Sequence, residues 1–292
     1  MSDKKTILII GKGFLGTYIE NISYKFKVVG TRLKSEKNVI SLDVRNFENV
    51  ELVFKKINPD YVINCAVRGD IDNLQNNKEL AFSVNSQGPE NIAISCKENK
   101  TRFIHISTDS VFDGEMGNYT EKDIPNPVNV YAESKLKGEL KIAKISNNYV
   151  IARTNFYGID YSGNYFFNWI LNSIKENKQI NGFSDVIFSP LDILTLSKMI
   201  IEILQTKYVG IINFSSGIPI SKYDFIIKVT KLLGCSIENI HKSSIDDTKI
   251  LSSRPKNTSL NNQIVTDLLK TPILTVEEWI KENREEIISL IR

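Results

Sequence analysis

The stretch ILIIGKGFLG, residues 7–16, decides the fold of this chain. It opens with four apolar residues, as is typical of a strand that a parallel sheet buries on both faces. Gly11, Gly13 and Gly16 then follow in a G-x-G-x-x-G pattern, and residues 14–22 carry the periodicity of a helix. In such a turn the first glycine permits the tight bend, the second lets backbone approach a pyrophosphate, and the third lets the helix pack closely on the strand. The stretch therefore predicts a dinucleotide-binding strand–turn–helix unit.

Short apolar runs alternate with longer helical segments through the rest of the first half. The expected strands are residues 7–10, 27–30, 39–42, 61–64, 102–107 and 149–153, and the expected helices are residues 14–22, 47–57, 80–98 and 131–144. This alternation is typical of an α/β fold with a doubly wound parallel sheet, here of Rossmann type. The rhythm changes near residue 158; beyond it we expect helices at residues 191–204, 222–233 and 276–290 and a strand at residues 210–214. These patterns predict a Rossmann domain at residues 1–158, to which later strands return, and a smaller, mostly C-terminal α/β substrate-binding region at residues 159–292.

The end of the second expected strand indicates which dinucleotide binds. An NAD site usually places Asp or Glu there, to accept a hydrogen bond from the ribose 2′-hydroxyl. Here the segment reads GTRLK at residues 30–34, and no carboxylate occurs before Glu36. Thr31 and Arg32 are suited to a 2′-phosphate instead, although a solvated arginine at a strand end would leave the same pattern. The predicted cofactor is NADP(H), with NAD(H) as the alternative.

The segment YAESK, residues 131–135, places a phenol and an ammonium one helical turn apart. A cation in this position is expected to lower the pKa of Tyr131 from about 10 toward neutrality, where the phenol exchanges protons readily. Lys135 is also placed to bind the ribose hydroxyls of a nicotinamide cofactor. Thr108 follows the strand at residues 102–107 and can donate a hydroxyl hydrogen bond to a carbonyl at the carboxyl edge of the sheet. Taken alone, YAESK also fits a solvated helix face and the segment around Thr108 also fits a cap. Together, in the order glycine loop, strand-end hydroxyl and YAESK, the motifs predict carbonyl reduction.

The composition limits the classes of partner. The 37 basic and 34 acidic residues are spread along the chain, without the basic stripe that nucleic-acid binding needs. No apolar stretch approaches the ~20 residues of a membrane span, and the N-terminal apolar run is too short for a signal peptide. Cys65, Cys96 and Cys235 lie far apart and form no metal-ligand pattern with the two histidines. We therefore expect no metal site, no membrane or nucleic-acid partner, and a reducing, cytoplasmic location.

With these motifs the chain resembles the extended short-chain dehydrogenase/reductases, and among them the dTDP-4-dehydrorhamnose reductase family. The resemblance runs nearly end to end and is most specific in HISTDSVFDG, residues 105–114, which is similar to the family's STDYVFDG. Further matching segments are NCA at 64–66, PVNVY at 127–131, SKLKGE at 134–139, RT at 153–154 and RPKNTSL at 254–260. The resemblance implies NADPH-dependent reduction of a 4-keto-6-deoxy sugar nucleotide in dTDP-L-rhamnose and surface polysaccharide synthesis.

The resemblance also implies roles for individual residues. Thr108, Tyr131 and Lys135 would form the catalytic triad, and Thr108 and Asp109 would face the sugar. Arg254 is expected to hold a diphosphate by paired hydrogen bonds, unless it is a surface arginine before a turn proline. The family's cofactor positions are matched by Gly13, Phe14, Leu15, Asp43, Val44, Val67, Arg68 and Gly69, with Asp43 near the adenine.

Two positions and one segment depart from the family's pattern. Ser110 and Phe156 stand where the family has Tyr and Trp, and its DQxGxPT motif is reduced to DVIFSPL at residues 185–191. Because these positions line the sugar and nucleotide end, a reductase of another nucleotide-linked hexulose is the alternative.

Other activities of the fold are less consistent with these residues. A 4,6-dehydratase would carry Glu in place of Ser110, and a fucose-synthase-type epimerase-reductase would carry Cys there and a later His. A non-catalytic relative, such as the regulatory β subunit of methionine adenosyltransferase, has no need of Tyr131 and Lys135. The sequence leaves open the nucleotide, the product stereochemistry, any Mg²⁺ requirement and the oligomeric state, monomer or homodimer.

Overall fold

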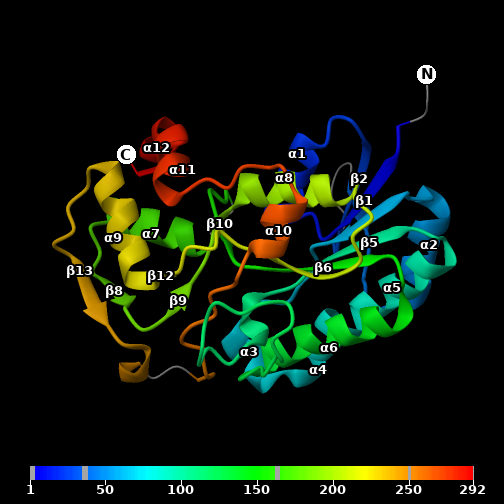
Figure 1. The fold of residues 1–292 in the computed structure, drawn as a ribbon, viewed down its shortest axis with the longest axis horizontal. Helices are drawn as coiled ribbons and strands as arrows, with labels where there is room; N and C mark the ends of the chain where they lie inside the picture. Colours follow the sequence, from blue (N-terminus) through cyan, green and yellow to red (C-terminus); the bar gives the residue numbers. More distant parts are fainter. Residues whose placement is uncertain (1–3, 35–38, 162–164, 249–250, 292) are drawn as a thin grey trace.

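Seven parallel strands form the central sheet of the protein, a computed structural model of which describes residues 4–34, 39–161, 165–248 and 251–291. The strand order is β11-β6-β5-β4-β1-β2-β3 (Figure 1). The strands are β1 (Thr6–Ile10), β2 (Lys27–Arg32), β3 (Ile40–Ser41), β4 (Tyr61–Asn64), β5 (Arg102–Ile106), β6 (Tyr149–Thr154) and β11 (Gly210–Phe214). The order reverses between β1 and β4, which is where open α/β sheets bind ligands. The predicted doubly wound α/β class is confirmed.

Helices cover both faces of this sheet, and their apolar residues form its two core layers. One face is covered by α1 (Phe14–Ile22), α8 (Ile193–Ile203) and α10 (Gln263–Leu268). The other is covered by α2 (Phe47–Ile57), α5 (Gly88–Glu98) and α6 (Val130–Ile145). Both α8 and α10 come from the second half of the chain, as does β11, so the second half completes the layers that the first half begins.

The helix expected at residues 80–98 is interrupted. It consists of α4 (Lys78–Phe82), a π-helical turn η1 (Ser83–Gln87) and α5, with Asn85 inside the π turn. A Cβ atom on Gly138 of α6 would lie 2.4 Å from the carbonyl oxygen of Asn85, so only glycine permits this close packing of α6 against η1. The π turn therefore brings the backbone of residue 85 against the helix that carries the YAESK segment.

Two other expected helices also differ from the prediction. Residues 191–204 begin with β10 (Leu191–Asp192), which pairs with β7 (Phe156–Tyr157) before Asp192 caps α8. Residues 276–290 form two helices, α11 (Val276–Glu282) and α12 (Arg284–Ile291). They separate at Asn283, whose side-chain amide donates to the Trp279 carbonyl at 2.8 Å.

A second lobe lies on the left of Figure 1 and has its own apolar core. It contains α7 (Phe166–Lys175), α9 (Lys222–Leu233), α11, α12, β8 (Ile180–Phe183), β9 (Ile187–Phe188), β12 (Ile220–Ser221) and β13 (Ile240–Ser243). β13 pairs with β8 in parallel, and β12 pairs with β9 antiparallel. The boundary at residue 158 stays a prediction. In the described parts of the chain, no helix combines the length and apolar character needed to cross a bilayer.

Candidate active site

Three cavities lie along the carboxyl edge of the sheet, and neighbouring cavities share lining residues. The glycine-loop cavity, about 510 Å³, is lined by Gly11, Gly13, Arg32, Asp43 and Val67 among others. The tyrosine cavity, about 850 Å³, is lined by Thr108, Tyr131, Lys135 and Phe156, and it shares Gly11, Gly13, Cys65, Val67 and Tyr165 with the first. The Asp109 cavity, about 280 Å³, shares Asn155 and Phe166 with the second.

The glycine loop is closely packed. Gly11 has a φ of +83°, and a Cβ there would lie 2.5 Å from the amide nitrogen of Ala66. A Cβ on Gly16 would lie 2.9 Å from the Gly11 carbonyl oxygen. No side chain caps the start of α1, whose first turn lies beside these glycines. Its unpaired N–H groups therefore suit a phosphate, so the loop fits a dinucleotide.

Phe14, Leu15 and Gly69 line the tyrosine cavity, and Val44 and Arg68 line the glycine-loop cavity. Gly16 lines neither cavity, so its role in the turn is packing. The sequence-predicted cofactor residues thus gather around two adjoining cavities.

Basic side chains from the end of β2 and from the segment after β3 line the glycine-loop cavity. Arg32, Lys34 and Arg45 line it, and Asp43 is the single carboxylate among its described lining residues. Arg45 donates to both Asp43 carboxylate oxygens, which lowers the pKa of Asp43. The cavity therefore fits a phosphate on the adenosine ribose. Glu36, the first carboxylate after β2, lies outside the described residues.

Thr31 differs from its neighbour Arg32. Its side chain is fully buried, its hydroxyl has no hydrogen-bond partner, and it does not line the cavity. Successive strand residues face opposite sides of the sheet, so Thr31 and Arg32 cannot both reach one ligand. The Thr31 carbonyl instead accepts hydrogen bonds from the amides of Gly11 and Lys12, at 3.2 and 2.7 Å. In the structure it holds the loop, and the expectation that its hydroxyl binds a 2′-phosphate stays a prediction.

Tyr131 and Lys135 lie on the first two turns of α6. The helix begins at Val130 because the side chain of Asn129 accepts the Ala132 N–H at 2.9 Å. The helix thereby directs Tyr131 and Lys135 into the tyrosine cavity, where Thr108 lies at the end of β5. The structure thus brings the three predicted catalytic residues to one cavity.

The pKa of Tyr131 shifts in the direction opposite to the one expected from the sequence. Burial raises it to about 12, and a hydrogen bond with Thr108 opposes that rise only in part. The Lys135 ammonium is not among the groups that oppose this rise, and it donates to the Ile106 carbonyl at 2.6 Å. Tyr131 is therefore protonated at neutral pH, which is the form that a proton donor needs.

His105 and Asn64 lie beside Lys135, an arrangement that the sequence pattern does not predict. Asn64 Oδ1 accepts the Ala66 N–H, so its Nδ2 donates to His105 Nδ1 at 3.0 Å. His105 is fully buried, and burial lowers its pKa well below the usual value. A neutral imidazole that accepts at Nδ1 carries its proton at Nε2, which lies 3.2 Å from Lys135 Nζ. The two nitrogens thus face each other with N–H donors. Burial lowers the pKa of Lys135 to about 8.

Asp109 organises the border between the tyrosine cavity and the Asp109 cavity. Its buried carboxylate accepts hydrogen bonds from four side chains: Thr108 Oγ1, Ser110 Oγ, Asn155 Nδ2 and Thr258 Oγ1. These donors satisfy the carboxylate within the protein. Asp109 therefore orients Thr108 and Ser110, the two hydroxyls on either side of it.

Arg254, which the sequence predicts to bind the substrate diphosphate, contacts other groups of the protein in the structure. Arg254 and Ser110 do line the Asp109 cavity, but the guanidinium donates to Asp72 Oδ1 at 3.0 Å and to the Ser252 carbonyl at 3.1 Å. Phe156 lines the tyrosine cavity instead, with its ring centroid 5.9 Å from that of Phe14. Lys222 is a further cation that lines the Asp109 cavity, and it was not predicted as a site residue from the sequence.

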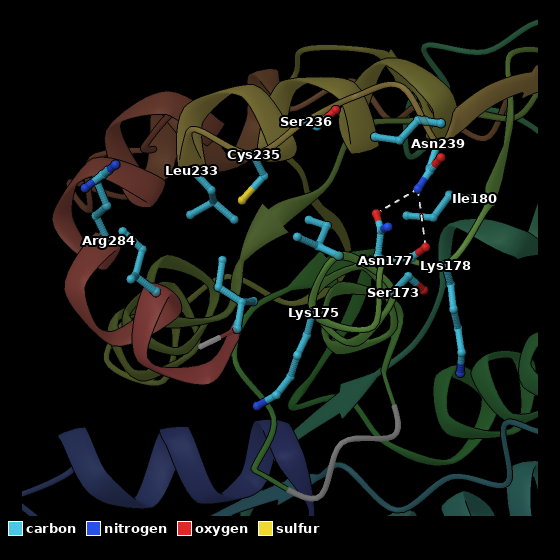
Figure 2. Close-up of a pocket in the computed structure, with 14 residues that line it drawn as sticks. Ser173, Lys175, Asn177, Lys178, Ile180, Leu233, Cys235, Ser236, Asn239 and Arg284 are labelled. Atoms are coloured by element: carbon cyan, nitrogen blue, oxygen red, sulfur yellow. Dashed lines mark hydrogen bonds between the residues drawn. The ribbon is translucent and has the colours of Figure 1, made fainter.

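A separate cavity of about 530 Å³ lies in the second lobe, between α7, the end of α9 and α12 (Figure 2). The Asn239 side chain donates to Asn177 Oδ1 at 2.7 Å at its rim. No predicted catalytic or cofactor residue lines this cavity. Two of its basic side chains are engaged, since Lys175 donates to the Leu290 carbonyl and Lys178 pairs with Glu176.

Known proteins share both the sequence and the fold of this chain. A family model described as the RmlD substrate binding domain matches residues 5–288. A probable low-salt glycan biosynthesis reductase of Haloferax volcanii is 30% identical over 227 residues, which cover 75% of each chain. The dTDP-4-dehydrorhamnose reductase of Aggregatibacter actinomycetemcomitans is 29% identical over 75% of this chain and 79% of its own.

Solved structures agree with this relationship. The dTDP-4-dehydrorhamnose reductase of Bacillus anthracis, in complex with NADP, superposes with a TM-score of 0.86 at 26% identity, over 98% of this chain and 99% of that one. The orthologue from Clostridium acetobutylicum gives a TM-score of 0.86 at 28% identity, over 98% and 100% of the two chains. The chain therefore belongs to the dTDP-4-dehydrorhamnose reductase family and is an oxidoreductase of the NAD(P)H-dependent short-chain dehydrogenase/reductase type.

Proposed function

We propose that this protein uses NADPH to reduce the keto group of a 4-keto-6-deoxy sugar nucleotide, with dTDP-4-dehydrorhamnose as the leading substrate. One observation carries the proposal: Thr108, Tyr131 and Lys135 line a cavity that adjoins the glycine-loop cavity on one side and the Asp109 cavity on the other. A cofactor and a sugar nucleotide would thus meet at the three predicted catalytic residues. The product would enter dTDP-L-rhamnose and surface polysaccharide synthesis.

In this proposal the chain's own residues place one proton. NADPH, when bound, supplies the hydride. The phenol of Tyr131 is protonated at neutral pH because burial raises its pKa to about 12, and it donates that proton to the keto oxygen. Thr108 donates to Asp109 in the structure, and it would turn its single hydroxyl hydrogen from Asp109 to the same keto oxygen. Lys135, anchored to β5 through the Ile106 carbonyl, would bind the nicotinamide ribose.

The cofactor preference follows from the cations at the glycine-loop cavity. Arg32, Lys34 and Arg45 would bind a 2′-phosphate, and Asp43, paired with Arg45, would lie near the adenine. The NADP complex of the Bacillus anthracis relative supports this choice. NADP(H) is preferred in this proposal and NAD(H) remains usable.

A second candidate is the reduction of another nucleotide-linked hexulose. Ser110 and Phe156 replace a phenol and an indole at the sugar end, and the Haloferax volcanii relative is named for glycan biosynthesis rather than for rhamnose. A differently substituted ring, such as an acetamido sugar, would fit the smaller side chains.

We further propose a cytoplasmic location, which suits the three free cysteines. We also propose the division of the chain into two regions at residue 158. The homodimer stays a prediction.

The proton donor gives the sharpest test of this function. We expect Tyr131→Phe to lower kcat by about 10²–10⁴-fold while leaving NADPH affinity nearly intact, because only the proton is lost. The measurement is NADPH absorbance decay with a panel of 4-keto-6-deoxy sugar nucleotides. Tyr24→Phe, on an exposed tyrosine, is the matched control. Near-normal turnover of Tyr131→Phe would refute the assignment, and no turnover of the wild type with any sugar of the panel would refute the function.

A further inference from the structure

Lys222 is a cation with no anionic partner in the Asp109 cavity. It is the first residue of α9, after Ser221, whose side chain caps the helix. The Lys222 ammonium lies 3.3 Å from the ring centroid of Phe188 and 4.3 Å from that of Phe166. Within the described residues these two cation–π contacts are its partners, and it forms no ion pair or hydrogen bond there. Its three N–H donors are thus available to a ligand in the cavity.

This position is unfavourable for a cation in the protein alone. A lysine in the first turn of a helix faces the positive end of the helix dipole. Burial lowers the pKa of Lys222 to about 7, and the charge of Asp109 opposes that shift only in part. Groups whose charge a cavity disfavours, and which no internal partner compensates, are frequent at functional sites.

The other charged groups of the cavity are already engaged. Arg254 is bound by Asp72 and by the Ser252 carbonyl. The Asp109 carboxylate accepts four internal hydrogen bonds. Among the described side chains that line this cavity, Lys222 is therefore the cation that neither a carboxylate nor a carbonyl of the protein binds.

We propose that the Lys222 ammonium binds the diphosphate of the nucleotide-sugar substrate in the Asp109 cavity. The inference rests on the proposed function, and it moves the predicted diphosphate contact from Arg254 to Lys222. Phe166 lines both this cavity and the tyrosine cavity, so a sugar beside Tyr131 and a diphosphate beside Lys222 belong to one continuous site. The rings of Phe166 and Phe188 hold the ammonium in place, and the anionic oxygens complete its hydrogen bonding.

The test is calorimetric titration of the NADP-bound protein with dTDP, UDP, GDP and CDP, and with thymidine as the uncharged probe. We expect Lys222→Met to raise the Kd of the preferred diphosphate by about 10- to 100-fold, as loss of a charge-assisted hydrogen bond does. Thymidine binding should stay unchanged, and Lys222→Arg should bind the diphosphate more tightly than Lys222→Met does, because the cation and its N–H donors remain. Lys228→Met is the matched control on the same helix, since Lys228 pairs with Glu277 at 2.6 Å.

Thermal unfolding separates recognition from a structural role. If Lys222 serves the ligand, Lys222→Met keeps or raises Tm, because it removes a partly buried and unpaired charge. Unchanged diphosphate affinity in Lys222→Met, or wild-type protein that binds none of the four diphosphates, would overturn the inference. An equal loss of thymidine and diphosphate binding would also overturn it, because the defect would then not concern the anion. Turnover is measured separately. If diphosphate binding depends on Lys222 but the protein oxidises no NADPH, the proposed function is refuted and the diphosphate site at Lys222 is retained.

Discussion

Arg32 contacts both the glycine loop and the cavity that the loop helps to form. Its Nε donates to the Lys12 carbonyl at 2.5 Å, and its side chain lines the glycine-loop cavity. We expect Arg32→Asp to shift the preference from NADPH toward NADH, because a carboxylate accepts from a ribose 2′-hydroxyl and repels a 2′-phosphate. The measurement is kcat/KM with each cofactor. Lys4→Asp, remote from the cavities, controls for the change of charge, and a wild type that already favours NADH would contradict the 2′-phosphate interpretation.

Residue-scale prediction from sequence succeeded where function depends on local spacing and failed where it depends on burial. The spacing of four between Tyr131 and Lys135 places both in one cavity, as expected. The direction of the Tyr131 pKa shift was wrong, because the sequence does not reveal that burial outweighs the neighbouring cation. His105 and Lys222 were missed because their partners come from other elements, which only the folded chain brings together.

At the scale of elements, a buried ion pair fastens α6 to β6. Arg153 of β6 donates to Glu139 of α6 at 2.7 Å, both side chains are 2% exposed, and Ser107 also donates to Glu139. We expect Arg153→Met to cost about 3–5 kcal/mol of unfolding free energy, because the Glu139 carboxylate is left buried and unpaired. The double variant Arg153→Met/Glu139→Gln should recover most of that loss. Urea unfolding measures both.

The exposed pair of Lys178 and Glu176 is the control for this ion pair. Its disruption by Lys178→Met should change the unfolding free energy by about 0–1 kcal/mol. A single Arg153→Met variant that is no less stable than the double variant would contradict the coupling.

Whether an element could be predicted depended on how local its signals are. The bounds of α1, α2, β4, α9 and β11 were predicted to the residue, since apolar periodicity and turn residues mark them in the sequence. The π turn η1 was not predicted, because one extra residue in a helical turn leaves no compositional trace. The short strands β7 and β10 exist only through pairing with each other, across more than thirty residues of chain.

At the scale of the whole molecule, the first half does not close its own core. Leu196 and Ile200 of α8 and Val265 of α10 pack on the same face of the sheet as α1, and β11 forms the edge beside β6. We expect a fragment of residues 1–158 to lack a cooperative thermal transition, because this apolar face would be exposed to water. Near-UV circular dichroism of the fragment and of the full chain makes the comparison. A cooperative melt of the fragment would contradict this interdependence.

The shared walls of the three cavities also bear on inhibition. Asn155 and Phe166 line both the tyrosine cavity and the Asp109 cavity, so the two cavities adjoin at these side chains. Two weak fragments, one beside Tyr131 and one beside Lys222, could therefore be joined by a short tether. Tethering makes the second contact intramolecular, and avidity of this kind can exceed either separate affinity by ~10²–10⁴-fold. The continuity of the cavities thus makes the enzyme open to bivalent ligands that copy neither cofactor nor sugar in full.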